Sequence, residues 1–245
     1  MWARIGASGL IIPLCVHLLI RSQCREFTVG KLLYLEASPR QEQSYTSRAA
    51  KIFIETYLIE NPQDTVDHYH LFEHEVPEFD QEAALQKMQH ISRLIKEGKG
   101  IDPIGKWAAV LEQVDRLKAA DKVLISSPMW NFSIPYRLKQ YFDVIVQPGL
   151  TFGVNRKGEY VGLLRNKRMQ LILASGSAYP VRFPREDDGP KTDFQRCYLE
   201  HMARYIGIDD VRTIKIDPTE AAAPPAVEKM FESKLNEVRD AARSF

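Results

Sequence analysis

The chain has 245 residues, a formal net charge of +1 at neutral pH, and 44% hydrophobic and 10% aromatic residues. This composition suits one large globular domain and excludes a disordered chain, and the balanced charge gives no reason to expect a nucleic acid or an anionic membrane as partner. The three cysteines are an odd number without metal-ligand spacing, which argues against a disulfide framework or a zinc site and favours a reducing cytoplasm.

The first 30 residues differ from the rest of the chain. The apolar run from Leu10 to Ile20 is too short to span a bilayer as a helix, and no convincing signal-peptide cleavage site follows it. We therefore expect residues 1–30 to lie outside the fold and residues 31–245 to form a single domain. One explanation is a translation start assigned too early, with Val29 encoded by an alternative start codon, which mass spectrometry of the native amino terminus would test.

The first strand is predicted at Lys31 to Glu36, followed by a polar loop and by a helix that opens at Ser44-Tyr45-Thr46-Ser47. Hydroxyl groups beside a helix amino terminus are typical of a phosphate site, because unpaired N–H groups and the helix dipole favour an anion. The motifs of triphosphate and dinucleotide binding are missing from this loop, so a phosphate monoester remains. The alternative is that Ser44 only caps the helix.

A second strand is predicted at Thr65 to Leu71. His68 and His70 alternate along it and face one side, but no third ligand lies nearby in the sequence. We therefore predict that both are surface or edge residues rather than metal ligands. Helices are predicted at residues 81–97 and around residues 107–117, separated by a glycine-rich break that is either a substrate loop or a linker.

The most informative stretch runs from Ser127 to Pro135. It follows a buried apolar strand and precedes an amphipathic helix. Ser133 is the expected N-cap of that helix, and Pro135 suits its first turn. The corner places Trp130, Phe132 and free backbone N–H groups at the carboxyl end of a strand, where open α/β sheets bind ligands. The alternative is a packed aromatic turn without a ligand.

The second half continues the alternation of strands and helices. Further elements are predicted as a small hairpin within residues 153–164, strands at 168–174 and 211–216, and helices at 192–206 and from residue 224 onward. The strand at 168–174 ends in a second serine- and glycine-containing loop, and the polar loop at 181–190 is a candidate lid. The alternation predicts a parallel sheet with right-handed crossovers, whose loops converge on one crevice.

In this order, the motifs resemble those of the FMN-dependent NADH:quinone oxidoreductase and azoreductase family, from about Lys31 to the carboxyl terminus. The resemblance is carried by the first loop, by the corner with its Leu138–Asp143 helix, and by the Gly149–Phe152 stretch. It implies an α/β, flavodoxin-like fold, with a doubly wound five-stranded parallel sheet and helices on both faces. It also implies FMN as cofactor, NADH or NADPH as co-substrate, a quinone or azo compound as electron acceptor, and a homodimer.

The resemblance further implies three groups of cofactor-binding residues. These would hold the FMN phosphate (Ser38, Ser44, Tyr45 and Thr46), lie against the isoalloxazine (Met129, Trp130, Asn131 and Phe132) and flank the other edge of the ring (Ser175, Gly176, Ser177 and Ala178). Two positions depart from the family pattern. Gly176 stands where arginine is common, and Trp130 stands where tyrosine is common.

The implied mechanism is ping-pong hydride transfer through the flavin, in which the protein supplies orientation and hydrogen bonds. Tyr179 or solvent would then give the acceptor its proton. Two other interpretations remain open from the sequence. A non-enzymatic flavodoxin-like electron carrier is usually smaller and acidic, and a phosphodiesterase of the kind once assigned to acyl-carrier protein would need a metal cluster or an activated nucleophile, for which the spacing is not convincing.

Overall fold

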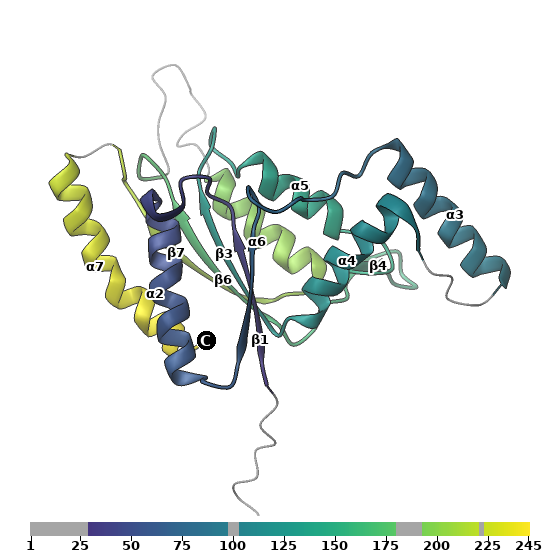
Figure 1. The fold of residues 1–245 in the computed structure, drawn as a ribbon, viewed down its shortest axis with the longest axis horizontal. Helices are drawn as coiled ribbons and strands as arrows, with labels where there is room; N and C mark the ends of the chain where they lie inside the picture. Colours follow the sequence, from purple (N-terminus) through teal and green to yellow (C-terminus); the bar gives the residue numbers. More distant parts are fainter. Residues whose placement is uncertain (1–28, 98–102, 180–192, 221–222) are drawn as a thin grey trace, which may run out of the picture.

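The computed structural model describes residues 29–97, 103–179, 193–220 and 223–245. Its centre is a five-stranded sheet in which every neighbouring pair is parallel and the order is β2-β1-β3-β6-β7 (Figure 1). The strands are β1 (Lys31–Glu36), β2 (Thr65–His70), β3 (Lys122–Pro128), β6 (Arg168–Ala174) and β7 (Asp210–Ile216). After β1 the chain places β2 on one side of it and then adds β3, β6 and β7 on the other side. This change of side confirms the predicted flavodoxin-like sheet.

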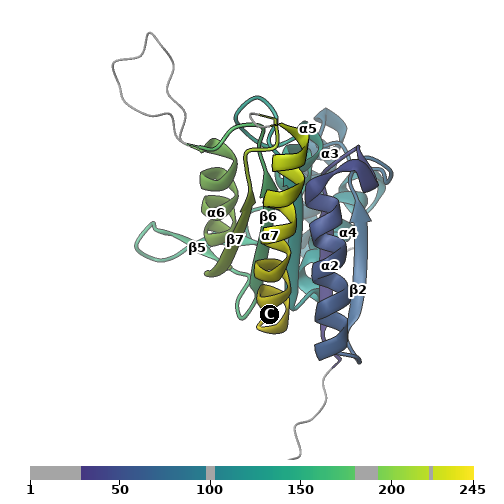
Figure 2. The same cartoon turned by 90° about the vertical axis from the view of Figure 1, so that its left-hand side faces the viewer.

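Helices cover both faces of the sheet. One face is packed by α2 (Tyr45–Glu60) and α7 (Pro224–Arg243), which lie side by side in Figure 2. The opposite face carries α4 (Gly105–Ala119), α5 (Tyr136–Ile145) and α6 (Phe194–Ile206), with α3 (Gln81–Glu97) packed against α4. Alternate strand residues supply the two cores: Leu32 and Leu124 face α2 and α7, whereas Leu33 and Val123 face the other helices. This two-sided burial explains the nearly continuous apolar strands.

Smaller elements complete the fold. A short 3₁₀ helix, η1 (Gln41–Gln43), precedes α2, and the predicted hairpin is formed by β4 (Phe152–Val154) and β5 (Tyr160–Gly162). One detail of the prediction is wrong. Pro135, and not Ser133, is the N-cap residue of α5, because the backbone of Ser133 is engaged in a tight turn with Trp130. The placing of His68 and His70 on an edge strand is confirmed, although the His70 side chain is only 4% exposed.

Some predictions fall outside the described residues. These are the amino-terminal segment up to residue 28, most of the break after α3, and the polar loop proposed as a lid, for which residues 180–192 are not described. Within the ranges that are described, no helix combines the length and the apolar character needed to cross a membrane.

Candidate active site at the carboxyl edge of the sheet

The loop after β1 folds back onto the amino terminus of α2. Ser44 caps this helix: its side chain accepts a hydrogen bond from the backbone N–H of Ser47 at 3.5 Å, and its hydroxyl lies 2.9 Å from that of Thr46. Ser38, Ser44 and Thr46 are at most 6% exposed. The capping role foreseen as an alternative is therefore present, and it places two hydroxyl groups at the positive end of a 16-residue helix.

Tyr45 occupies a different position from its neighbours. Its ring lies 5.1 Å from that of Phe231 in α7, and the guanidinium of Arg48 lies 5.4 Å from its centre. Its side chain thus takes part in the packing between α2 and α7. Its backbone remains in the first turn of α2, where helix N–H groups are available to an anion.

The corner after β3 is a tight two-residue turn. Met129 donates its N–H to the carbonyl of Ala174 at 2.7 Å, and Trp130 and Ser133 exchange backbone hydrogen bonds at 3.0 and 2.9 Å. Between them Asn131 and Phe132 have φ angles of 47° and 69°, the signature of a type I′ turn. Asparagine tolerates this conformation, whereas an aromatic residue is strained by roughly 1 kcal/mol or more. The turn nevertheless presents Phe132 with 43% of its surface exposed.

Two further aromatic residues hold Trp130 in place. Phe72, in the loop after β2, lies 5.7 Å from Trp130, and Tyr136, the first residue of α5, lies 6.1 Å from it. The rings of Phe72 and Tyr136 also meet edge to face at 5.7 Å. The sequence reasoning missed this cluster, although Phe72 closely follows the end of β2 and Tyr136 begins α5, two elements that were correctly predicted.

The third loop is fixed by the segment after β7. Ser175 accepts a backbone hydrogen bond from Thr219, and Gly176 accepts one from Glu220, both at 3.0 Å. A Cβ atom at Gly176 would lie 2.8 Å from the Glu220 carboxylate. A side chain at position 176 would therefore require the exposed Glu220 side chain to shift. Ser177 is half-buried, and Ala178 is exposed at the end of the loop.

Tyr179 connects the third loop with the corner. Its ring meets that of Phe132 edge to face at 6.4 Å. Burial and the carboxylate of Asp193 raise the pKa of Tyr179, and the nearby Lys215 only partly opposes them. The phenol is therefore protonated at neutral pH, and the raised pKa also makes it a weaker acid than a free tyrosine. Asp193 itself is held by an ion pair with Lys215 at 3.1 Å.

Together, these loops form a site of backbone groups, hydroxyls and aromatic rings. They follow the adjacent strands β1, β3 and β6, so they meet at one edge of the sheet (Figure 1). The hydroxyls and first-turn N–H groups of α2 have the chemistry that binds a phosphate, and the aromatic rings of the turn and of Tyr179 have the chemistry that packs against a flat ring. In the part of the chain that the structure describes, no group of three or more His, Cys, Asp or Glu side chains could hold a metal ion.

Known proteins share this architecture. Residues 30–241 match a family model described as the flavodoxin-like fold, which makes the chain a flavodoxin-like protein. A FMN-dependent NADH:quinone oxidoreductase from Nitratidesulfovibrio vulgaris (strain DP4) is 39% identical over 219 residues, covering 89% of this chain and 100% of that protein. A second protein so named, from Bradyrhizobium diazoefficiens, is 38% identical over 80% of this chain and 91% of its own length. The chain belongs to this family of FMN-dependent NADH:quinone oxidoreductases.

Solved structures agree with this assignment. An azoreductase from Bacillus anthracis (strain Sterne) superposes with a TM-score of 0.71 at 27% identity, over 89% of this chain and all of that one. A FMN-dependent NADH-azoreductase from the Ames Ancestor strain, solved in complex with FMN, gives 0.69 at 28% identity, over 87% of this chain and 98% of that one. The resemblance noted in the sequence motifs is confirmed.

Proposed function

We propose that the protein is an FMN-dependent oxidoreductase that transfers electrons from NADH to quinones and azo compounds. The observation that carries this proposal is the pairing of a hydroxyl-bearing helix amino terminus with a strained turn that exposes Phe132 at the same edge of the sheet. Relatives that carry the FMN-dependent names match along nearly the whole domain, which supports FMN as the cofactor here.

In this proposal the first loop binds the phosphate and the other two loops enclose the ring. Ser38, Ser44, Tyr45 and Thr46 surround the phosphate, Tyr45 through its backbone. Met129 to Phe132 contact the isoalloxazine on one side and Ser175 to Ala178 on its other edge. When bound, FMN supplies the chemistry of accepting and giving a hydride, which side chains cannot perform.

The remaining steps fall to the protein. NADH and the electron acceptor occupy the crevice in turn, as a ping-pong order requires, and the aromatic rings of Trp130 and Phe132 favour flat substrates. Tyr179 donates the proton that a reduced quinone or azo compound needs, since its phenol stays protonated at neutral pH. We propose that the protein is cytoplasmic, in line with the free cysteine Cys197. We also propose that it forms a homodimer, as the family resemblance implies.

The test is an absorbance spectrum of the purified protein, followed by anaerobic addition of NADH and then benzoquinone. Flavin bands that bleach with NADH and return with the quinone, together with steady NADH turnover, are expected. Bands that change without steady turnover would instead indicate an electron carrier. No flavin, even after FMN is added and the excess removed, would contradict the proposal. Phosphodiester hydrolysis without flavin would favour the hydrolase alternative.

A further inference from the structure

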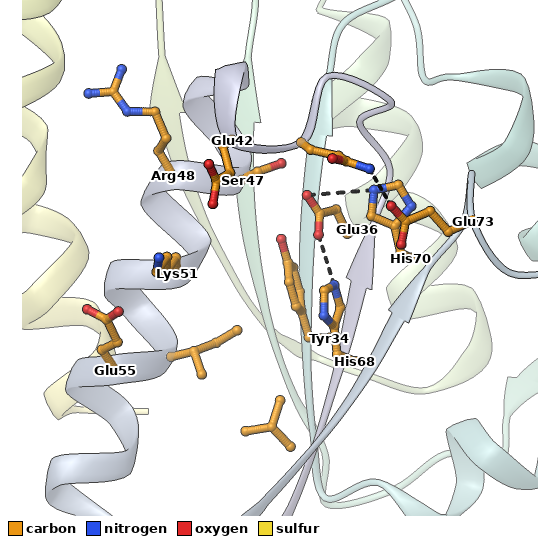
Figure 3. Close-up of a pocket in the computed structure, with 13 residues that line it drawn as sticks. Tyr34, Glu36, Glu42, Ser47, Arg48, Lys51, Glu55, His68, His70 and Glu73 are labelled. Carbon is orange, nitrogen blue, oxygen red and sulfur yellow. Dashed lines mark hydrogen bonds and ion pairs between the residues drawn. The ribbon is translucent and has the colours of Figure 1, made fainter.

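A pocket of about 710 Å³ lies on the other side of α2 from the neighbouring α7, between α2 and the edge strand β2. It exists because α2 packs over β3 and β6, which leaves the β1 and β2 side of this face uncovered. Figure 3 shows its lining, drawn from β1, β2, α2 and the η1 region. None of the residues proposed above to contact FMN lines the pocket, which begins beside them at Gln41, Glu42 and Ser47.

A charged carboxylate lies at the base of this pocket. Glu36 accepts a hydrogen bond from Nε2 of His68 at 2.8 Å, and the His68 ring stacks on Tyr34 at 4.6 Å. Burial alone would raise the pKa of Glu36, but the hydrogen bond from His68 and the nearby imidazoles lower it below its usual value. Glu36 is therefore an ionised hydrogen-bond acceptor at neutral pH.

His70 supplies an unsatisfied donor beside this carboxylate. Its Nδ1 accepts the backbone N–H of Phe72 at 3.2 Å, so the neutral ring carries its proton on Nε2. Nε2 is buried, has no hydrogen-bond partner among the described residues, and lies 4.0 Å from Oε1 of Glu36. A hydroxyl oxygen beside this pair, about 2.8 Å from each of the two atoms, would accept from His70 and donate to Glu36. A metal ion does not suit this position, because a protonated Nε2 has no lone pair to donate to a metal.

The walls are apolar, and the rim is negative. Ile54 and Val66 are partly buried and line the pocket beside the Tyr34 ring. Three further carboxylates, those of Glu42, Glu55 and Glu73, also line it. Arg48 turns away toward α7 (Figure 3), where Glu228 binds it at 2.6 Å, so Lys51 is the remaining cation among the described lining residues. The field in the pocket therefore favours a positive charge.

We propose that this pocket binds a cationic phenol, that is, an aromatic ring with a hydroxyl at one end and a protonated amine at the other. The hydroxyl bridges His70 and Glu36 from the pocket side, the ring packs on Ile54 and Val66, and the ammonium group faces the carboxylates of the rim. The hydroxyl is the specific element, since it matches a buried donor and a buried acceptor that otherwise fail to reach each other. The site is independent of the proposed oxidoreductase function.

Three matched probes test this proposal on the full chain: tyramine, phenethylamine without the hydroxyl, and 4-hydroxyphenylacetate with an anion in place of the amine. Calorimetry and the ¹⁵N signals of the His70 ring are measured with and without FMN. Tyramine is expected to bind saturably and to shift the His70 signals, and the other two probes to bind at least about tenfold more weakly. Equal binding of all three, no binding, or tyramine binding that FMN abolishes would overturn the proposal.

A pair of charge reversals on α2 provides the control. Glu55 lines the rim, whereas Glu60 lies on the same helix outside the pocket, and both are exposed. Glu55→Lys is expected to weaken tyramine binding about fivefold, and Glu60→Lys to leave it unchanged. Equal effects of the two variants, or no effect of either, would contradict the assignment. Because this binding does not depend on flavin, its failure is distinguishable from failure of the oxidoreductase proposal.

Discussion

The loop after β1 and the corner after β3 stand side by side at one edge of the sheet, but they are built in opposite ways. In the first loop the hydroxyls of Ser44 and Thr46 are buried and bonded to each other, and Ser44 also caps α2. In the corner, Asn131 and Phe132 are exposed and the backbone is strained. The first loop is held by buried hydrogen bonds between its own side chains, although Gln41 within it also has a positive φ of 48°. The corner instead exposes both of its positive-φ residues.

This difference separates two kinds of site. In the first loop the same atoms hold the fold and are proposed to hold the phosphate, so substitutions there should change stability and FMN affinity together. In the corner the aromatic surface contributes little to the core, so substitutions should change activity while stability stays nearly constant. Strain kept at a surface turn is common where a ligand uses the exposed group.

The largest effect is expected at Tyr179, which packs on the corner. Tyr179→Phe keeps the ring that meets Phe132 and removes only the phenol. Stopped-flow kinetics should show that reoxidation by a quinone slows about 100-fold, as expected for loss of a general acid, while reduction by NADH is unchanged. An equal effect on both half-reactions, or none, would remove Tyr179 from the mechanism.

Removing the cap tests the first loop. Ser44→Ala deletes the side-chain acceptor for the Ser47 N–H and the partner of Thr46. The free energy of unfolding should fall by about 1 kcal/mol, and the Kd for FMN should rise about tenfold, measured by urea denaturation and flavin fluorescence. Ser47→Ala serves as control, because the Ser47 hydroxyl has no hydrogen-bond partner among the described residues. A change in only one of the two quantities for Ser44→Ala would break the comparison.

Glu36, at the end of β1, provides a second test of stability, and the expected result depends on pH. The pKa of Glu36 is lower in the folded protein than its usual value of 4.5, so its stabilising contribution is present above that value and is lost as the pH falls through the folded pKa. Glu36→Gln should reduce the free energy of unfolding by about 1 kcal/mol at pH 7. The difference from the unsubstituted protein should shrink on acidification, and a constant difference down to pH 3 would contradict the ionised state.

The smallest change in stability is expected in the corner. Phe132→Asn relieves the strain of an aromatic residue at φ 69° but removes the contact with Tyr179, and these effects of roughly 1 kcal/mol each should nearly offset one another. Thermal unfolding should therefore be almost unaltered while quinone turnover falls. A protein that loses about 2 kcal/mol, or that keeps full turnover, would show that the corner is an ordinary packed turn.

The sequence predicted the sheet well because its apolar runs coincide with strands buried on both faces. It could not show the turn conformation of Asn131 and Phe132, because Ser133 followed by Pro135 is also typical of a helix N-cap and first turn. It missed the contact between Glu36 and the two histidines, because these residues lie 32 and 34 positions apart and meet only through the parallel register of β1 and β2, where Glu36 pairs with His70. The roles of the individual flavin-site residues stay predictions.

The order of the strands also leaves β2 and β7 at the two edges of the sheet. Each carries charges: Asp67 in β2 is paired with Lys31 at 3.2 Å, and β7 contains Arg212 and Lys215. An incoming strand from another molecule would have to strip water from these groups, a common defence against aggregation by edge-to-edge pairing. The homodimer proposed above would therefore form through helices and loops, without extending the sheet.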